Sequence, residues 1–291
     1  MFDLGSKSLA IEILNKLLSN IFEREPELKP LLKLKNKSIY QGEWINISIN
    51  NKYNKCINLR HGRGIQSWVN GSKYIGYWIL DKPFIKGKLI HSKNDFYEGE
   101  FINEKAEGYG CYKYLDGSIY EGYWINDMQH GYGKEIWPDG SVFEGNFVNG
   151  DKNGKGVFKW SDNSIYKGDF KNNKFHGRGI YIWSDKRIYI GLWNNNRMHG
   201  KGNFTWPDNR KYIGDYYNDK KHGYGLFEWS DGRKYRGYWV DGKQSGEGEF
   251  YDYTGNSNDE FISNNKQISN NWRKGLWENG KFKHWLDNSI K

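Results

Sequence analysis

Hydrophobic and polar residues alternate with a period of two along most of this chain, and the alternation recurs every 23 residues. In one copy, Tyr189, Gly191 and Trp193 fall on one face of a predicted strand, a polar turn follows at 194–197, and a second alternating run occupies 200–206. Alternation of this kind indicates a strand with one buried face, because successive side chains of a strand point to opposite sides. Each copy is therefore predicted to be a β-hairpin, joined to the next copy by a second tight turn.

Every copy begins with an aromatic residue, one variable residue and a glycine. Self-similarity at a fixed period indicates an array of one small supersecondary unit. The second turn of each copy mostly ends in Asp-Gly or Asp-Asn, which tolerate positive φ, whereas Lys186 departs from this pattern. The evenly spaced starts are Tyr74, Tyr97, Tyr120, Phe143, Tyr166, Tyr189, Tyr212 and Tyr235, and a further copy opens at Tyr40.

One face of the predicted strands carries aromatic residues that alternate with glycine. A glycine inside a strand costs about 0.5–1 kcal/mol relative to alanine, so a glycine slot that recurs in the copies implies that packing offsets this cost. We expect the glycines to leave hollows for the rings of neighbouring strands, with about 0.5–1.5 kcal/mol gained per ring contact. The residues that we expect to build the repeat include Tyr97, Gly99, Tyr120, Gly122, Trp124, Gly131, Gly133, Trp137, Tyr166, Gly168, Tyr189, Gly191, Trp193, Tyr212 and Gly214.

These patterns predict an all-β fold, an elongated single-layer antiparallel meander of tandem hairpins, preceded by an amphipathic α-helix. Residues 1–35 are expected to form this helix, at 3–25, and a linker. Ser6 can cap the helix, apolar residues recur at i, i+3 and i+4 within it, and Pro26 ends it. The helix either covers the exposed edge of the first repeat or docks into the groove of a partner.

Residues 36–255 are predicted to hold nine repeats, with an insertion at 46–60 that we expect to form a surface loop in the first one. The second copy departs from the consensus, because Phe84-Ile85-Lys86 replaces the usual His-Gly-x element. Residues 256–291 are predicted to form a polar loop and a degenerate capping repeat, since the terminal units of an array must close an open edge.

The composition indicates a basic protein and favours a reducing compartment. The formal net charge is +9, the mean hydropathy is −0.94 and the aromatic fraction is 18%. A basic chain can attract acidic partners, membranes or nucleic acid, although solubility alone also accounts for such a charge. Two cysteines give no disulfide framework, which favours the cytoplasm. The sequence has neither an apolar run of about 20 residues, the length of a spanning helix, nor a recognisable secretory signal.

The histidines do not predict a metal or catalytic site. They share one repeat slot, and equivalent residues of adjacent hairpins lie two strands apart, about 9.6 Å. One zinc ion needs its ligands within a few Å of each other. We instead expect each histidine to hydrogen-bond its own turn, and we predict no cofactor, no metal and no enzymatic activity. The slot is occupied by His61, His130, His176, His199 and His222.

Basic turns recur at one edge of the predicted array and are candidate contacts for an anionic partner. A cation near an acidic membrane surface contributes about 1 kcal/mol. Acidic residues such as Asp219 alternate with these cations, so solvated turns remain an equally simple interpretation. Nucleic acid is not predicted as a partner, because most aromatic rings are committed to internal packing. The candidate cations are Lys171, Lys174, Arg197, Lys220 and Lys221.

The repeat consensus is similar to the signature of the MORN (membrane occupation and recognition nexus) family. Its fullest copy reads Tyr120-x-Gly122-x-Trp124, a polar turn, and then His-Gly-x-Gly ending at Gly133. The resemblance extends over residues 40–255. Members of this family occur beside kinase or methyltransferase domains, in junctional membrane proteins, and alone in cilia, basal bodies and parasite division rings. Since nothing resembling a catalytic domain is attached, the chain is most similar to the stand-alone scaffold members.

This resemblance implies a non-enzymatic protein–protein scaffold in a cytoskeletal assembly. The implied setting is cytoplasmic and cytoskeleton-associated, in a cilium, flagellum or basal body, with an axonemal radial spoke as one example. The alternative is a peripheral membrane adaptor that binds acidic phosphoinositides. The expected partners are other proteins of a larger assembly, while a homodimer and an acidic lipid surface stay open. The sequence leaves open which partner is bound and which face or edge of the array binds it.

Overall fold

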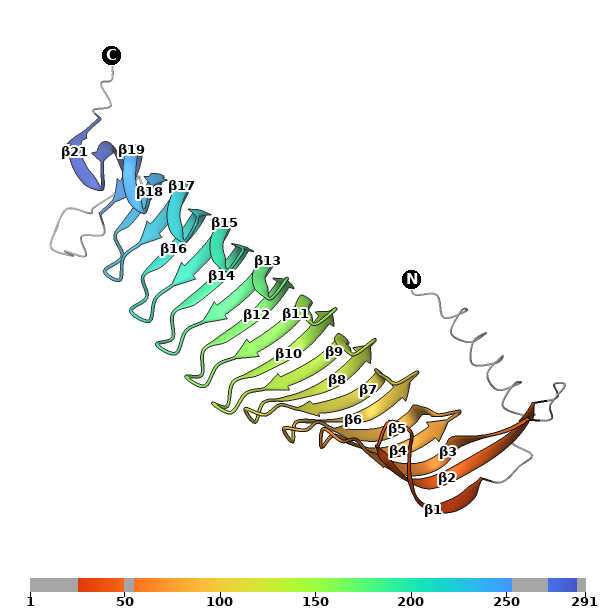
Figure 1. The fold of residues 1–291 in the computed structure, drawn as a ribbon. Coiled ribbons are helices and arrows are strands. Elements are labelled where there is room, and N and C mark those ends of the chain that lie inside the picture. The colour runs from red at the N-terminus through yellow and green to blue at the C-terminus, as the bar shows by residue number, and fades with distance from the viewer. Residues whose placement is uncertain (1–25, 50–54, 253–271, 287–291) are drawn as a thin grey trace, which may run out of the picture. The chain divides into compact units, whose positions relative to one another are not determined.

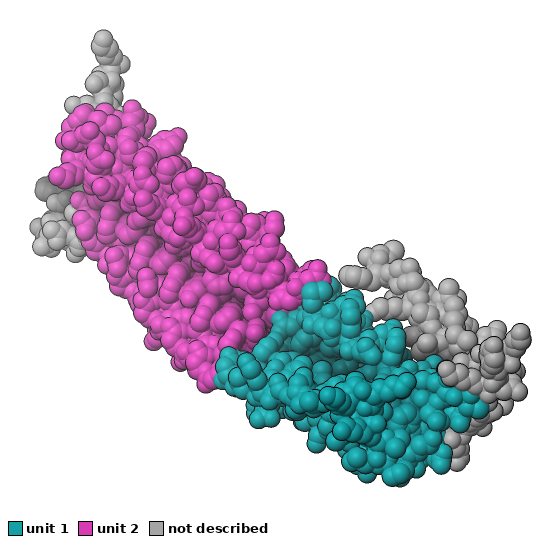
Figure 2. All heavy atoms as spheres, viewed as in Figure 1, with its two compact units in different colours: residues 1–130 teal, residues 131–291 magenta. Residues whose placement is uncertain are grey.

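The computed structural model describes residues 26–49, 55–252 and 272–286, and the helix predicted at 3–25 lies outside them. All 21 elements in the described residues are β-strands (Figure 1). The chain divides into two compact units, Met1–His130 and Gly131–Lys291, which are described separately (Figure 2). Within each unit, strands that follow one another in sequence pair antiparallel, so the predicted all-β antiparallel meander is confirmed.

The first unit contains eight complete strands and the start of a ninth. They are β1 (Glu27–Lys33), β2 (Ile39–Ile49), β3 (Lys55–Ser67), β4 (Lys73–Ile79), β5 (Lys82–Ile90), β6 (Phe96–Ile102), β7 (Lys105–Lys113), β8 (Ile119–Ile125) and β9 (Met128–Ile136), within which the unit boundary falls.

The second unit continues with the same hairpin arrangement. Its strands after β9 are β10 (Val142–Val148), β11 (Asp151–Lys159), β12 (Ile165–Lys171), β13 (Lys174–Ile182), β14 (Ile188–Asn194), β15 (Arg197–Thr205), β16 (Lys211–Tyr217), β17 (Lys220–Glu228), β18 (Lys234–Val240), β19 (Lys243–Tyr251), β20 (Trp272–Glu278) and β21 (Lys281–Trp285). The last hairpin, β20–β21, pairs with β19 and lies in the segment where we expected a closing repeat.

Two kinds of tight turn join the strands. In the hairpins whose turns the structure describes, the turn has two residues with positive φ, such as Asn172 at 48° and Asn173 at 64°. This is the geometry of a type I′ turn, whose twist matches that of the flanking strands and which favours asparagine and glycine. The turn between hairpins has one left-handed residue, which is Gly140 in one copy and Lys186 in another.

Most hairpins are held together by a tyrosine ring that covers two facing glycines, and Phe143 takes this place in one of them. In one hairpin, Gly168 lies directly opposite Gly179, and Tyr166 is fully buried above them. A Cβ atom built on Gly168 would lie 2.6 Å from the Tyr166 hydroxyl and 2.6 Å from the Cα of Gly179. The Tyr166 hydroxyl donates a hydrogen bond of 2.9 Å to the carbonyl of Asp169. The expected seating of rings over glycine is therefore confirmed, and no side chain fits in the glycine slots without a shift of the backbone.

The same tyrosine connects its hairpin to the next one. The ring of Tyr166 meets Phe170 of its own hairpin edge-on at 5.1 Å and Trp193 of the following hairpin edge-on at 5.5 Å. In the first unit, Tyr97 meets Phe101 at 5.1 Å and Trp124 at 5.2 Å in the same way. Edge-to-face contacts are a favoured geometry for aromatic pairs. We call the side of each unit that carries these rings the ring face, and the opposite side the open face.

Two sequence-based expectations about the N-terminal part were wrong. Residues 27–33, expected to belong to a linker, form β1, which pairs with β2 and shifts register near Pro30, a residue that cannot donate to a ladder. The described residues of the insertion, 46–49 and 55–60, lengthen the β2–β3 hairpin instead of belonging to a surface loop, as the pairing of Ile47 with Ile57 shows. Its residues alternate between apolar and polar, which favours continued pairing, and Ile45 is buried.

Ile85 occupies a backbone position where the structure predicts strain. Its φ is 64°, whereas the equivalent slots of other hairpins hold glycines such as Gly108 and Gly177. A left-handed backbone costs an L-residue about 1–2 kcal/mol, and a β-branched residue is among the least tolerant.

We predict that Ile85→Gly raises the free energy of unfolding by about 1 kcal/mol, measured by chemical denaturation, because Ile85 is half-exposed and loses little burial. As the control, Ile75→Gly in an extended strand should lower it by about 0.5–1 kcal/mol, and stabilisation by both variants would refute the strain argument.

A second prediction concerns the covered glycines. Gly168→Ala should lower the free energy of unfolding by about 3 kcal/mol, the upper part of the range for an overpacked core, because its methyl group would meet backbone and ring atoms. Gly140→Ala is the control, since its Cβ would meet nothing within 4 Å and only the positive φ opposes it, at about 1 kcal/mol. Equal losses for the two variants, in the same denaturation experiment, would show that ring contact does not set the glycine slots.

Candidate docking face

The open face of the second unit presents aliphatic side chains in register across neighbouring strands. Val157 on β11 lies opposite Lys167 on β12, Lys167 lies opposite Ile180 on β13, and Ile180 lies opposite Ile190 on β14. Ile180 is 36% exposed and Ile190 is 50% exposed. Apolar side chains therefore lie at the surface of this sheet, although the rings on its other face are buried.

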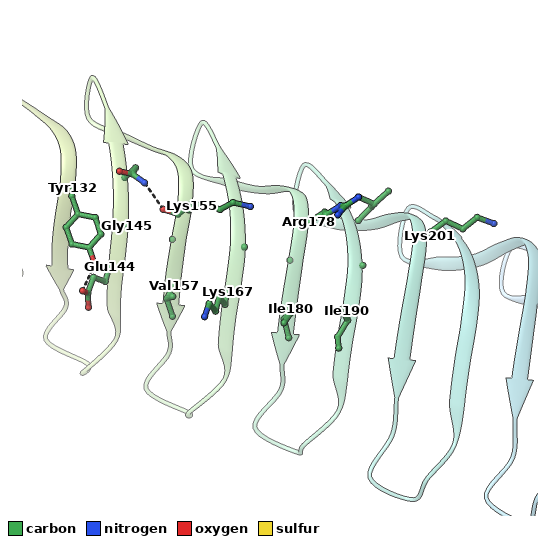
Figure 3. Close-up of a pocket in the computed structure, with 16 residues that line it drawn as sticks. Tyr132, Glu144, Gly145, Lys155, Val157, Lys167, Arg178, Ile180, Ile190 and Lys201 are labelled. Carbon is green, nitrogen blue, oxygen red and sulfur yellow. Dashed lines mark hydrogen bonds between the residues drawn. The ribbon is translucent and has the colours of Figure 1, made fainter. Parts of the chain in front are cut away.

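An open trough of about 850 Å³ runs along this face from Tyr132 on β9 to Lys201 on β15 (Figure 3). The backbones of the paired glycines form part of its lining. Aliphatic side chains supply much of the rest, namely Val157, Ile180, Ile190 and Leu192. The trough is open along its length, unlike the enclosed pockets that bury most of a small ligand.

Basic side chains border the trough at regular intervals. Lys155, Arg178 and Lys201 lie on β11, β13 and β15, each on the second strand of its hairpin (Figure 3). Lys155 forms a salt bridge with Asp169, and Lys201 forms one with Asp215 at 2.8 Å.

Two further cations of the trough are not neutralised in this way. Within the described part of the chain, neither Arg178 nor Lys167 makes a salt bridge. At one end of the trough, the carboxylate of Glu144 accepts a 2.5 Å hydrogen bond from the hydroxyl of Tyr132. The centre of the trough thus combines two cations that make no salt bridge with an aliphatic surface, and the Asp169 carboxylate lies near Arg178.

The first unit has a smaller depression on its open face, with a different charge pattern. Its volume is about 550 Å³, and its lining includes Lys86, Lys88, Glu98, Glu100 and the thiol of Cys111. Lys88 and Glu98 form a salt bridge of 2.9 Å. Burial raises the pKa of Cys111, which opposes formation of a thiolate. Carboxylates and cations are balanced here, in contrast to the trough of the second unit.

Four of the five predicted edge cations lie at the turn edge of the second unit. Lys171, Lys174, Arg197 and Lys220 are exposed beside the turns inside the hairpins. Lys220 forms a salt bridge of 3.4 Å with Asp241. This edge is accessible to an anionic partner, but it carries acidic groups between its cations.

Lys221, the fifth predicted cation, belongs to the ring face instead of the edge. Its Nζ atom lies 4.2 Å from the ring centre of Trp239, 4.4 Å from that of Phe227 and 5.4 Å from that of Tyr212. Burial lowers the pKa of Lys221 to about 8, with a further contribution from the charge of Arg210. Lys221 therefore does not extend the row of surface charges.

The turn side chains tie each hairpin to its neighbour. The Asn196 side chain accepts a hydrogen bond of 2.7 Å from the backbone N–H of Phe175, and the Asn196 N–H donates one of 3.0 Å to the Phe175 carbonyl. Asp219 makes the same two bonds with Met198. The acidic and amide turn residues thus have a structural role that sequence analysis did not identify.

The histidines are placed differently from our expectation. Among the described residues, the buried Nδ1 atoms of His176, His199 and His222 have no hydrogen-bond partner, so the expected bonds to the turn are not made by these atoms. Tyr217 lies between two of them, with ring centres 5.1 Å from His199 and 5.7 Å from His222. Across the same described segments, no group of three His, Cys, Asp or Glu side chains could hold a metal ion.

The arrangement of tyrosines, glycines and type I′ turns agrees with a comparison against known families. A profile described as the MORN repeat matches residues 58–73, 97–119, 120–142, 143–165, 166–186, 189–209, 212–232 and 235–257, more than half of the chain. The chain belongs to the MORN repeat family. The copy that starts at Tyr74 is not among the matches, and it is the one in which Ile85 replaces glycine.

Comparison with solved structures gives matches of low identity and low TM-score. The TCP10 domain of Danio rerio CPAP, in complex with a peptide of Danio rerio STIL, is 12% identical with a TM-score of 0.43, covering 84% of this chain and 98% of that one. The TCP domain of Drosophila melanogaster SAS-4, in complex with a proline-rich motif of Ana2, is 16% identical with a TM-score of 0.34, covering 65% and 97%. These scores are too low to transfer a partner to the MORN repeats of this chain.

Two other comparisons are negative. No curated protein sequence matches this chain. Within residues 26–49, 55–252 and 272–286, no helix has the length and apolarity required to cross a membrane.

The environment of Lys221 predicts a pH-dependent stability. Because its pKa is about 8 in the folded state and about 10.4 when unfolded, the unfolded state binds more protons between these values, and stability should rise with pH there. We predict that Lys221→Met raises the melting temperature at pH 7 and that this gain shrinks between pH 8 and 10. Lys220→Met, which removes the neighbouring exposed amine, is the control and should show no such trend. A gain for Lys221→Met that is independent of pH would contradict the prediction.

Proposed function

We propose that this chain is a non-enzymatic scaffold that holds partner proteins against the open face of its MORN repeats. The observation that carries the proposal is the trough of the second unit, where exposed Ile180, Ile190 and Leu192 lie beside Arg178 and Lys167. An exposed apolar patch bordered by polar groups is typical of a protein-interaction site. The open shape suits a polypeptide better than a small molecule.

The repeat architecture supports a spacing role. Each hairpin contacts the hairpins before and after it through the same ring and turn contacts, so equivalent docking positions recur along each unit. We place the scaffold in a cytoskeletal assembly, with a ciliary or axonemal complex of radial spoke or basal body type as the specific setting. The support for this setting is the resemblance to stand-alone members of the MORN family.

A peripheral membrane adaptor for acidic phosphoinositides is the second candidate. The exposed cations Lys171, Lys174 and Arg197 at the turn edge favour it. Asp219 and Asp241 lie among these cations and reduce the positive potential of the edge. The scaffold hypothesis is preferred because the trough collects aliphatic side chains in register on adjacent strands, whereas the exposed valines of the turn edge, Val148 and Val240, lie four hairpins apart.

Retention in the cytoskeleton tests the proposed function. In cells that express tagged full-length chain, the wild type should stay with the detergent-resistant cytoskeleton and localise to a cilium or basal body. Ile180→Asp combined with Ile190→Asp should abolish retention, because charges on the trough floor oppose an apolar partner. Val69→Asp combined with Leu115→Asp is the control, since both residues are exposed and lie in turns.

Three results would contradict the proposal. A wild-type chain found entirely in the detergent-soluble fraction would contradict the cytoskeletal role. Equal retention of the trough variant and the wild type would contradict the use of the open face. Binding of vesicles that contain phosphatidylinositol bisphosphate, lost on charge reversal of Lys171 and Lys174, would favour the membrane adaptor.

A further inference from the structure

The bordering cations of the trough have a fixed spacing that restricts what can bind there. Lys155, Arg178 and Lys201 occupy the same slot in three successive hairpins, each directly before a paired glycine. Strands β12 and β14 lie between them, and the β12–β13 and β14–β15 pairs shift register just beyond the paired glycines. Strands of a sheet lie about 4.8 Å apart, so adjacent cations of this row are about 9.6 Å apart. An occupant that runs along the trough crosses the strands and meets one cation per hairpin.

An extended peptide matches this spacing and an α-helix does not. The extended polyproline II form has three residues per turn and rises about 3.1 Å per residue, so one turn covers about 9.3 Å, close to one hairpin. A helix rises 1.5 Å per residue and would need about 6.4 residues per hairpin, which turns each successive contact by about 80° away from the sheet. In the polyproline II form every third side chain points to the same side, whereas residues three apart in a β-strand point to opposite sides. Only this extended form can present the same kind of side chain to each of the three cations.

The chemistry of the occupant follows from the charges that remain unneutralised. Lys155 and Lys201 already pair with Asp169 and Asp215, whereas the guanidinium of Arg178 makes no salt bridge within the described segments. The Asp169 carboxylate accepts a 2.9 Å hydrogen bond from the Arg178 backbone N–H. The guanidinium of arginine binds carboxylates in a bidentate manner. A carboxylate at the centre of the occupant would therefore meet Arg178, with carboxylates on either side near the two lysines.

The floor beside these cations selects aliphatic side chains. Ile180, Ile190 and Leu192 are 36%, 50% and 38% exposed, and they lie on the same strands as, or next to, Arg178. Charged and aliphatic side chains thus lie side by side, at the same height above the sheet. A bilayer separates charge and apolar groups by depth, with headgroups outermost, so a membrane matches this surface poorly.

We infer that the trough of the second unit binds an extended peptide segment of a partner protein, with a carboxylate at every third residue and aliphatic side chains between. This inference rests on the proposed scaffold function and names the partner segment. The depression of the first unit is not a second site of this kind, because Glu98 and Glu100 in its lining balance Lys86 and Lys88. The lining of the trough instead has an excess of cations, with Lys155, Lys167, Arg178 and Lys201 against Glu144.

The test uses the full-length chain and two fluorescent peptides of identical composition. The first probe contains four Glu-Leu-Ser triplets, and the second places the same glutamates at every second position. Fluorescence anisotropy at low and physiological ionic strength measures the dissociation constants. We expect the triplet peptide to bind at least about tenfold more tightly than its permuted partner, a difference of about 1.4 kcal/mol.

Charge reversal assigns the binding to the trough. Arg178→Glu should weaken binding of the triplet peptide at least about tenfold, because it replaces the central cation with a repelling charge. Arg197→Glu is the matched control, since it makes the same change of charge at an exposed position of the turn edge and should alter affinity less than about twofold. Unfolding midpoints of both variants should equal that of the wild type.

Distinct outcomes would overturn the inference. Equal affinity for the two peptides would refute the three-residue spacing. If Arg178→Glu and Arg197→Glu weakened binding of the triplet peptide equally, the attraction would depend on the overall charge of the chain and not on the trough. Displacement of the triplet peptide by phosphatidylinositol bisphosphate vesicles, in a manner that requires Arg178, would assign the trough to lipid. Failure to bind either peptide, while the trough variant still loses cytoskeletal retention, would reject this inference and leave the scaffold function intact.

Discussion

The seating of one tyrosine ring over two facing glycines is the constraint on which this structure depends. The pair Gly168 and Gly179 can approach only because neither carries a side chain, and Tyr166 fills the space above both. The ring then reaches Phe170 in its own hairpin and Trp193 in the next, so one residue stabilises a hairpin and joins it to its neighbour. Phe143 shows that the ring matters more than the hydroxyl, since it is equally buried over Gly145 and Gly156.

This constraint leaves the open face free for binding. Antiparallel sheets commonly bury one face and expose the other to water, and here the rings supply the buried layer within the sheet itself. Side chains of the open face need not pack on a second layer, so they can differ from hairpin to hairpin without loss of the fold. The trough with Arg178 in one unit and the charge-balanced depression with Glu98 in the other are two results of that freedom.

The sequence was sufficient to predict the hairpins, the turns and the packing of rings on glycine, because each is encoded within one repeat. It also contained signals that were overlooked, such as the alternation around Ile47 and Ile57 that lengthens the first hairpin. Lys221 lies an even number of residues before Gly225 and Phe227 on the same strand, so all three belong to the same face, the ring face. The trough could not be predicted from the sequence, because it combines residues from several strands. The register of these strands depends on a shift that each hairpin makes just beyond its paired glycines.

The slot just after the hairpin turn shows how far the ring face tolerates variation. Phe175 stacks on Tyr166 at 3.8 Å in one hairpin, whereas Lys152 fills the equivalent slot in another and pairs with Glu135 at 2.7 Å. Lys221 fills it again, surrounded by rings. Aromatic faces attract cations as well as other rings, so chemically different residues fit the same space. Since the hairpin geometry persists through such changes, differences between these hairpins in partner binding must come from their exposed residues, and the three bordering cations of the trough are the clearest such difference.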